Sequence, residues 1–151
     1  MQEQTVYFED VEIGQRRTSF GRTITEADVI LHAGHTGDFY PHHVDAEWAA
    51  ASEFGQRIAH GTLVFAVSVG MTAGDINPVA FSYGYDRLRF IRPVGIGDTI
   101  RVEVEIAEKR DNPRDPARGF VDELGKVINQ DGDLVMVFTH VYSVERRSTE
   151  G

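Results

Sequence analysis

The chain lacks cysteine altogether, and basic residues are scarce in it. It has 151 residues, with 15 lysines and arginines against 24 aspartates and glutamates, and its formal net charge is -9. The absence of thiols excludes disulfide bonds, cysteine nucleophiles and cysteine-based zinc sites. The acidic balance disfavours a nucleic-acid-binding protein, which normally presents a basic face. A few local arginines would still be enough to hold an anionic small ligand.

The chain also lacks a long hydrophobic run. Its longest stretch without a charged residue is 58–74, counting His60 as neutral, and this stretch is rich in glycine, serine and threonine. A membrane-spanning helix needs roughly 20 apolar residues, and the acidic start does not have the pattern of a signal peptide. We therefore expect a soluble, cytoplasmic protein. Its length predicts one domain over 1–151, with the core at about 8–145.

Three helices are expected in the first half of the chain. The first is predicted over about 26–34, where Thr25 and Asp28 form a typical helix start with a capping residue and an acid three positions later. The second is predicted over about 46–54. The third is predicted over about 60–73, where apolar side chains occur on all sides, and this pattern predicts a helix that is buried on every side.

Strands are expected in the second half. In 99–106 apolar and polar residues alternate, which predicts a sheet with one packed side and one wetter side. The predicted strands are 15–24, 80–93, 98–109, 118–129 and 134–144. Asp131-Gly132 is typical of a hairpin turn between the last two. Because helices come early and strands late, we expect an antiparallel α+β fold, a curved sheet wrapped around one long central helix.

Residues suited to acid–base chemistry lie in the middle of the chain. Asp38 and His43 are five positions apart across Pro41, in a segment expected to begin as a loop, because proline restricts the residue before it. His60 and Gly61 then precede the apolar helix. An Asp and a His can transfer protons as a pair, and free N–H groups at a helix start can stabilise a developing negative charge. Glycine at that point lets a carbonyl group approach the backbone closely.

Three segments of the chain together resemble a known family. The stretch 37–45 (GDFYPHHVD) resembles the hydratase motif of MaoC-like, (R)-specific enoyl-CoA hydratases, whose pattern is roughly D-x-N-P-hydrophobe-H. The stretch 54–61 (FGQRIAHG) resembles the family's start of the central helix, and 89–98 (RFIRPVGIGD) resembles its strand and turn. The resemblance covers about 8–144 and implies a single hot-dog fold.

This resemblance implies an enzyme that adds or removes water at the C2=C3 double bond of an enoyl-CoA. Its catalytic residues would be Asp38 and His43, which hold one water between them, and Gly61, whose N–H binds the thioester oxygen. The residues expected to bind substrate are Tyr40, His42, His60, Arg89 and Arg92. Two of these depart from the family pattern: Tyr40 stands where the family usually has Asn, and His42 where it has an aliphatic residue.

The resemblance also implies partners and the absence of others. CoA would be part of the substrate, with no separate cofactor and no metal. The fold implies a homodimer formed by pairing of open sheet edges, or an oligomer built from such dimers, because unpaired edges are normally paired or covered. No nucleic acid and no membrane is expected among the partners.

Other interpretations stay open at this point. A hot-dog thioesterase would use the same helix start for its oxyanion and a carboxylate for water attack on the carbonyl, and a non-catalytic acyl-CoA-binding module would keep only the fold. The side chains of His35, Asp38, His42, His43 and His60 are of types that bind zinc or iron, although no recognised ligand spacing links them. Arg89 and its neighbours on the predicted strand 80–93 would equally fit a solvated strand face.

Overall fold

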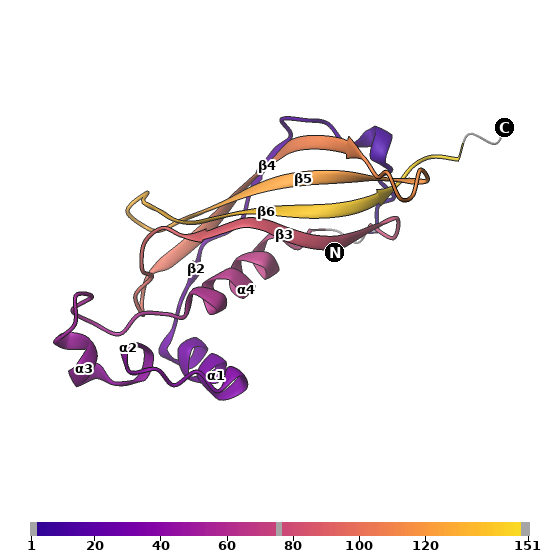
Figure 1. The fold of residues 1–151 in the computed structure, drawn as a ribbon. Coiled ribbons are helices and arrows are strands. Elements are labelled where there is room, and N and C mark those ends of the chain that lie inside the picture. Colours follow the sequence, from indigo (N-terminus) through magenta and orange to yellow (C-terminus); the bar gives the residue numbers. More distant parts are fainter. Residues whose placement is uncertain (1–2, 75–76, 149–151) are drawn as a thin grey trace.

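The computed structural model describes residues 3–74 and 77–148, in which one antiparallel sheet packs against a central helix, α4 (Gly61–Thr72). Three shorter helices, α1 (Glu26–Thr36), α2 (Pro41–Val44) and α3 (Ala46–Ala50), gather at one end of the molecule (Figure 1). The strands are β1 (Arg16–Thr18), β2 (Arg22–Thr23), β3 (Ala80–Phe90), β4 (Thr99–Asp111), β5 (Arg118–Ile128) and β6 (Leu134–Glu145). A short 3-10 helix, Phe8–Asp10, precedes them. The predicted α+β architecture, a curved sheet with a central helix, is confirmed.

The sheet has the order β1-β4-β5-β6-β3, and β2 also pairs with β4. All pairings are antiparallel, and β5 and β6 are joined by the predicted hairpin turn, where Gly132 has a positive φ of 84°. Strand β3 forms one edge of the sheet and has two bulges, between Ser82 and Gly84 and between Asp86 and Arg89. Bulges bend a strand and increase its twist, so this edge curves around α4.

The core lies between α4 and the facing side of the sheet. Leu63, Val64 and Val67 on α4 pack with buried valines of β4 and β5 and with Phe138 of β6. Fully burying side chains of this size stabilises the fold by roughly 1.5–3 kcal/mol each. Among the described helices, none is long and apolar enough to span a membrane.

The prediction that α4 is buried on every side is wrong for the single chain. Thr62, Ala66 and Gly70 are exposed and follow one another at intervals of four residues, so they form one face of the helix. This face is apolar or small rather than charged, which is why the sequence pattern did not distinguish it from the buried faces.

Two element boundaries also differ from those predicted. The single strand predicted over 15–24 is broken into β1 and β2, because the Ser19 hydroxyl accepts the N–H of Val102 and so replaces a backbone acceptor of the ladder. The helix predicted over 46–54 ends at Ala50, where the Ser52 hydroxyl donates to the carbonyl of Ala49. In both places a serine side chain competes with the backbone for hydrogen bonds.

A buried polar cluster lies beneath the C-terminal end of α4. Glu123 on β5 is 2% exposed and accepts two hydrogen bonds from Arg17, at 2.5 and 3.1 Å, while Arg17 also donates to the carbonyl oxygen of Thr72. Beside them, His140 stacks on Tyr85 with 4.2 Å between ring centroids. The bidentate pairing explains how a carboxylate is tolerated inside the sheet, since such pairs are the strongest charged hydrogen bonds.

We expect His140 to make the fold less stable in acid. Burial, together with the nearby charge of Arg17, lowers the pKa of His140 from 6.5 to about 4. The unfolded chain therefore binds a proton between these values while the folded chain does not, so stability is full above about 6.5 and is lost as the pH falls towards 4. Denaturant titrations at pH 7.5 and pH 5 should show a loss of about 2 kcal/mol from this residue.

The matched variant is His140→Gln, which keeps a hydrogen bond to the Ser82 hydroxyl but does not titrate. Its free energy of unfolding should fall less between the two pH values than that of the wild type. An equal fall in both proteins would show that other groups cause the acid sensitivity.

Candidate active site

His43 is the most constrained side chain of the site. It lies on α2, a single helical turn that begins at Pro41, and proline is favoured at the first position of a helix. His43 is 5% exposed, and its Nδ1 lies 2.8 Å from the carbonyl oxygen of Ile58. Because a carbonyl only accepts, Nδ1 carries the proton and Nε2 has the lone pair. His43 was expected on a loop, so the short helix is a correction.

The environment of His43 favours its neutral form. Burial lowers the pKa of His43; the hydrogen bond to Ile58 raises it, charges on His60 and His42 lower it, and Asp38 raises it. Burial acts most strongly, so the net shift is downward from 6.5. A neutral imidazole with its lone pair on Nε2 can accept a proton at neutral pH.

Asp38 reaches the same place from the loop after α1. Gly37, with a φ of 79°, ends α1 in the left-handed conformation that glycine tolerates. The exposed Asp38 side chain then accepts the N–H of Tyr40 at 3.2 Å. One carboxylate oxygen of Asp38 and one ring nitrogen each of His43 and His60 lie within 4.8 Å of one another. The structure therefore brings together the predicted pair, Asp38 and His43, at a spacing that one water can bridge.

His60 stands directly before α4 and stacks on His43 with 3.6 Å between ring centroids. Its Nε2 lies 2.9 Å from the backbone oxygen of Asp38, which makes Nε2 the donor. Its Nδ1 is buried and has no partner among the described residues. A second histidine, His32 on α1, lies 4.8 Å from the His60 ring and contacts the Thr62 hydroxyl at 2.9 Å. His60 thereby ties the Asp38 loop to the start of α4.

Asp38, His43 and His60 are of types that bind metal ions and are close enough to do so, but their orientation argues against it. The rings of His43 and His60 are 21° from parallel and stacked, so their in-plane lone pairs run side by side rather than converging. His43 Nδ1 and His60 Nε2 are also committed to backbone carbonyls. These two contacts leave fewer free ligand atoms for a metal ion, and the absence of a metal stays a prediction.

Gly61 is the first residue of α4, as predicted, and its N–H group belongs to the first turn of the helix. The first four N–H groups of a helix have no partner within it, and the dipole at this end favours negative charge. A Cβ atom added to Gly61 would lie 2.8 Å from the ring of Phe90. The aromatic ring therefore covers one side of this backbone, where only glycine fits without displacing it.

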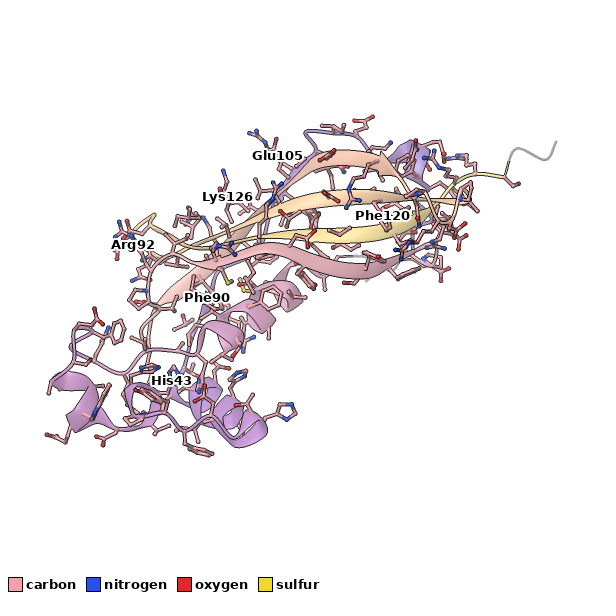
Figure 2. The ribbon with its side chains drawn as sticks, viewed as in Figure 1. His43, Phe90, Arg92, Glu105, Phe120 and Lys126 are labelled. Atoms are coloured by element: carbon pink, nitrogen blue, oxygen red, sulfur yellow. The ribbon has the colours of Figure 1, made fainter. Side chains whose placement is uncertain are left out.

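A cavity of about 360 Å³ opens beside these groups. His42 and His43 line it from α2, Gly61 and Val64 from α4, and Phe90 from the end of β3. The rest of the lining is formed by Phe54, Ile58, Ala59, Ile91, Arg92, Pro93, Val94, Val135 and Met136. Figure 2 shows His43 at the helical end of the molecule, with Phe90 and Arg92 toward the same end and Phe120 at the far end. Most of the lining is apolar, which suits an acyl chain.

Three of the residues predicted to bind substrate differ in whether they line the cavity. Arg92 lines the cavity and faces Asp133 at 3.5 Å. Arg89 is exposed on β3, outside the cavity lining, and donates to the carbonyl of Leu88. The ring of Tyr40 packs 4.6 Å from that of His42 and is not part of the lining either. The roles of Arg89 and Tyr40 stay predictions, without a contact to the cavity.

Some groups of the site were not found from the sequence. The backbone of Ile58 holds His43, and no side-chain signal marks a carbonyl oxygen. His32 was not among the predicted site residues, and its contact with Thr62 depends on the packing of α1 against α4. Phe90 belongs to a strand, and its place above Gly61 follows only from the way that β3 ends.

Known proteins with similar sequences show which family the chain belongs to. The model of the MaoC-like domain family matches residues 10–118. A 3-hydroxybutyryl-CoA dehydratase of Methylorubrum extorquens is 31% identical over 131 residues, which are 87% of this chain and 83% of that protein. The chain belongs to the MaoC-like domain family. This MaoC-like domain is also 38% identical over 104 residues to Protein MaoC of Klebsiella aerogenes, of which it spans 31%, so that relative is much longer.

Solved structures extend the likeness of the MaoC-like domain to its fold. A monoamine oxidase regulatory protein of Archaeoglobus fulgidus has a TM-score of 0.90 and 34% identity, covering 97% of this chain and 98% of that one. The R-hydratase PhaJ1 of Pseudomonas aeruginosa, without ligand, has a TM-score of 0.76 and 32% identity over 97% and 90% of the two chains. A Mycobacterium tuberculosis protein with a double hot-dog fold matches with a TM-score of 0.81 at 24% identity, covering 97% of this chain and 46% of that one. The MaoC-like domain therefore has the predicted hot-dog fold.

Proposed function

We propose that this MaoC-like domain is a hydro-lyase that adds or removes water at the C2=C3 double bond of an enoyl-CoA. The observation that carries the proposal is the meeting of Asp38, His43 and the start of α4 at one largely apolar cavity. The family supports it, because relatives of the chain are named dehydratases and hydratases. No separate cofactor enters the reaction, since CoA is part of the substrate.

The site residues have distinct tasks in this reaction. The thioester oxygen binds the N–H of Gly61, where the helix dipole stabilises the enolate that forms. A water between Asp38 and His43 loses a proton to Nε2 of His43 as its oxygen bonds to C3, and the pair then passes this proton on to C2, so both side chains return to their starting states. Both transfers then occur on one face of the double bond, and such positioned proton transfer is worth about 10²–10⁴ in rate.

Crotonyl-CoA is a direct test of this function. The protein is mixed with it, and loss of the enoyl absorbance is followed together with release of free thiol. A hydratase lowers the absorbance without releasing thiol. Thiol release would instead identify a thioesterase, and binding without either change would identify an acyl-CoA-binding module. A panel of longer, branched and dicarboxylic enoyl-CoAs then defines the acyl group.

We expect the arginines near the cavity to bind the phosphates of CoA. Arg92 lines the cavity and is 61% exposed in its side chain, and Arg89 is exposed nearby on β3 with no ion pair in the described part of the chain. Guanidinium groups suit phosphates because their donors form a planar fork. Arg92→Ala and Arg89→Ala should each raise KM more than they lower kcat, and the affinity for CoA should fall with added salt.

The matched control for these variants is Arg114→Ala, which removes an exposed arginine from the loop between β4 and β5. It should leave KM unchanged. If Arg89→Ala behaves like this control while Arg92→Ala raises KM, the phosphate contact belongs to Arg92 alone.

We also infer that the protein is a homodimer. Strand β3 pairs only with β6 among the described strands, so an 11-residue edge is left open. Helix α4 also exposes the small residues Thr62, Ala66 and Gly70, which allow another helix to approach closely. Open edges invite pairing with a second chain. Joining two β3 strands would place each cavity near the other subunit.

Light scattering at micromolar concentration should therefore give twice the mass of the chain, or a larger even multiple. A proline in place of Tyr83, which lies in the first bulge of β3 and has no partner on β6, would remove an N–H from this edge strand and should shift the protein toward monomer. A wild-type protein that stays monomeric across this range would contradict the dimer.

A further inference from the structure

His42 makes one close contact that the proposed reaction does not require. Its Nε2 lies 2.9 Å from Nε2 of His43, and the two rings meet edge to face with 4.0 Å between centroids. The carbonyl of Ile58 keeps the proton of neutral His43 on Nδ1. His43 Nε2 is therefore the acceptor in this contact, and His42 Nε2–H is the donor.

This hydrogen bond occupies the atom that would activate water. A ring nitrogen has a single lone pair in the plane of the ring. When His42 donates to it, no water can use it at the same time. We propose that His42 is a positioning residue that caps the proton-accepting nitrogen of His43 in the ligand-free protein and leaves it when substrate enters the cavity.

The surroundings of His42 allow this movement. Its side chain lines the cavity and is half-buried, unlike the buried His43. Aromatic packing holds the ring, with centroids 4.6 Å from Tyr40 and 5.9 Å from Phe54. The contact with His43 is its one side-chain hydrogen bond in the part of the chain that the structure describes. An acyl group that enters the cavity meets this ring on the wall and can push it aside.

Other charged or titratable groups also face His43. Asp38 lies on the loop before α2, and His60 stacks from the start of α4. His32 approaches from α1 behind His60, and Arg92, after β3, lines the same cavity. None of these is removed when His42 alone is replaced, so a matched pair of variants isolates the cap.

The cap should change the way that kcat/KM depends on pH, an expectation that rests on the proposed function. The cap and a proton compete for the same lone pair, so the cap both hides the base and lowers its apparent pKa by the same factor. Removing the cap should raise the plateau of kcat/KM at high pH and move the acid limb to higher pH. At low pH, where a proton displaces the cap anyway, kcat/KM should be unchanged.

The test compares two variants with the wild type on crotonyl-CoA. His42→Phe keeps an aromatic ring against Tyr40 and Phe54 but has no donor, and His42→Gln keeps an N–H donor that does not titrate. A hydrogen bond of ordinary net strength predicts a rise in the plateau of about threefold to tenfold for His42→Phe. His42→Gln should stay closer to the wild type. A uniform fall in kcat/KM at every pH, or an unshifted acid limb in His42→Phe, would overturn the proposal.

Nuclear magnetic resonance of the wild-type protein, labelled with ¹⁵N in its histidines, tests the cap without any substrate. Above the pKa of His43 we expect an unprotonated Nε2 on His43 with scalar coupling to a protonated Nε2 on His42. The coupling should vanish in His42→Phe and when a hydrolysis-resistant acyl-CoA ether is added. A protonated Nε2 on His43, or a coupling that survives the ligand, would overturn the proposal. Failure to hydrate any enoyl-CoA would instead contradict the proposed function, while the resonances would still decide the contact.

Discussion

Replacing Asp38 by Asn or His43 by Ala should lower kcat for enoyl-CoA hydration by at least about 10²-fold. The Asn side chain cannot take up or return the proton that the carboxylate transfers, and Ala removes the lone pair that Ile58 orients. Because the two groups share one water, the double variant should be little worse than the poorer single variant. Steady-state kinetics on the best enoyl-CoA of the panel measures all three effects.

His35→Ala is the matched control, since His35 is an exposed histidine at the end of α1. It should keep the kcat of the wild type. Circular dichroism and light scattering should show the same fold and assembly in every variant. If both Asp38→Asn and His43→Ala hydrate substrate at nearly the wild-type rate, these residues are not the acid–base pair.

Replacing Gly61 by Val should lower kcat by about 10²–10³-fold, the usual effect of losing one oxyanion donor. The N–H group remains in this variant, but its Cβ would lie 2.8 Å from the Phe90 ring. Either the ring is pushed into the cavity or the helix start shifts, and in both cases the thioester oxygen loses its place. Kinetics and the structure of a complex with an unreactive acyl-CoA measure the two consequences.

Gly34→Val is the control for this change, because a Cβ at Gly34 on α1 meets no atom within 4 Å. The double variant Gly61→Ala/Phe90→Leu should recover part of the activity that Gly61→Ala loses, since the smaller side chain relieves the contact. A complex in which the thioester oxygen lies beyond about 3.5 Å from the Gly61 nitrogen, without a bridging water, would reject the oxyanion role while leaving the hydratase proposal intact.

The bounds of the strands in the second half of the chain were largely predictable from the sequence. The bounds of the elements in the first half were less predictable. Strands β4, β5 and β6 begin and end within about two residues of their predicted bounds, and in β4 buried and half-buried side chains alternate over 99–106 as the sequence pattern predicted. The breaks in 15–24 and 46–54 depend on single serine hydroxyls, which carry no periodic signal. The exposed face of α4 was missed because its small residues look the same as buried ones.

The candidate site was predictable where its residues are close in sequence. Asp38 lies on the loop before α2 and His43 lies on α2 itself, so the short stretch of chain between them already limits their distance. The contacts of His43 with Ile58 and His60 come from a segment that returns 15 or more residues later, and their orientations depend on how α2 and α4 pack. The hydrogen bond between His42 and His43 joins neighbours in the chain, yet it follows from rotamers that spacing does not determine.

Ile58 hydrogen-bonds to His42 and His43 through its backbone alone. Its carbonyl holds His43, its N–H donates to the carbonyl of His42 at 3.0 Å, and its side chain forms part of the cavity wall. The backbone of Ile58 therefore orients the proposed base, while its side chain independently shapes the cavity. Exchanging this side chain for a smaller or larger one should change which acyl groups the proposed enzyme accepts without moving His43.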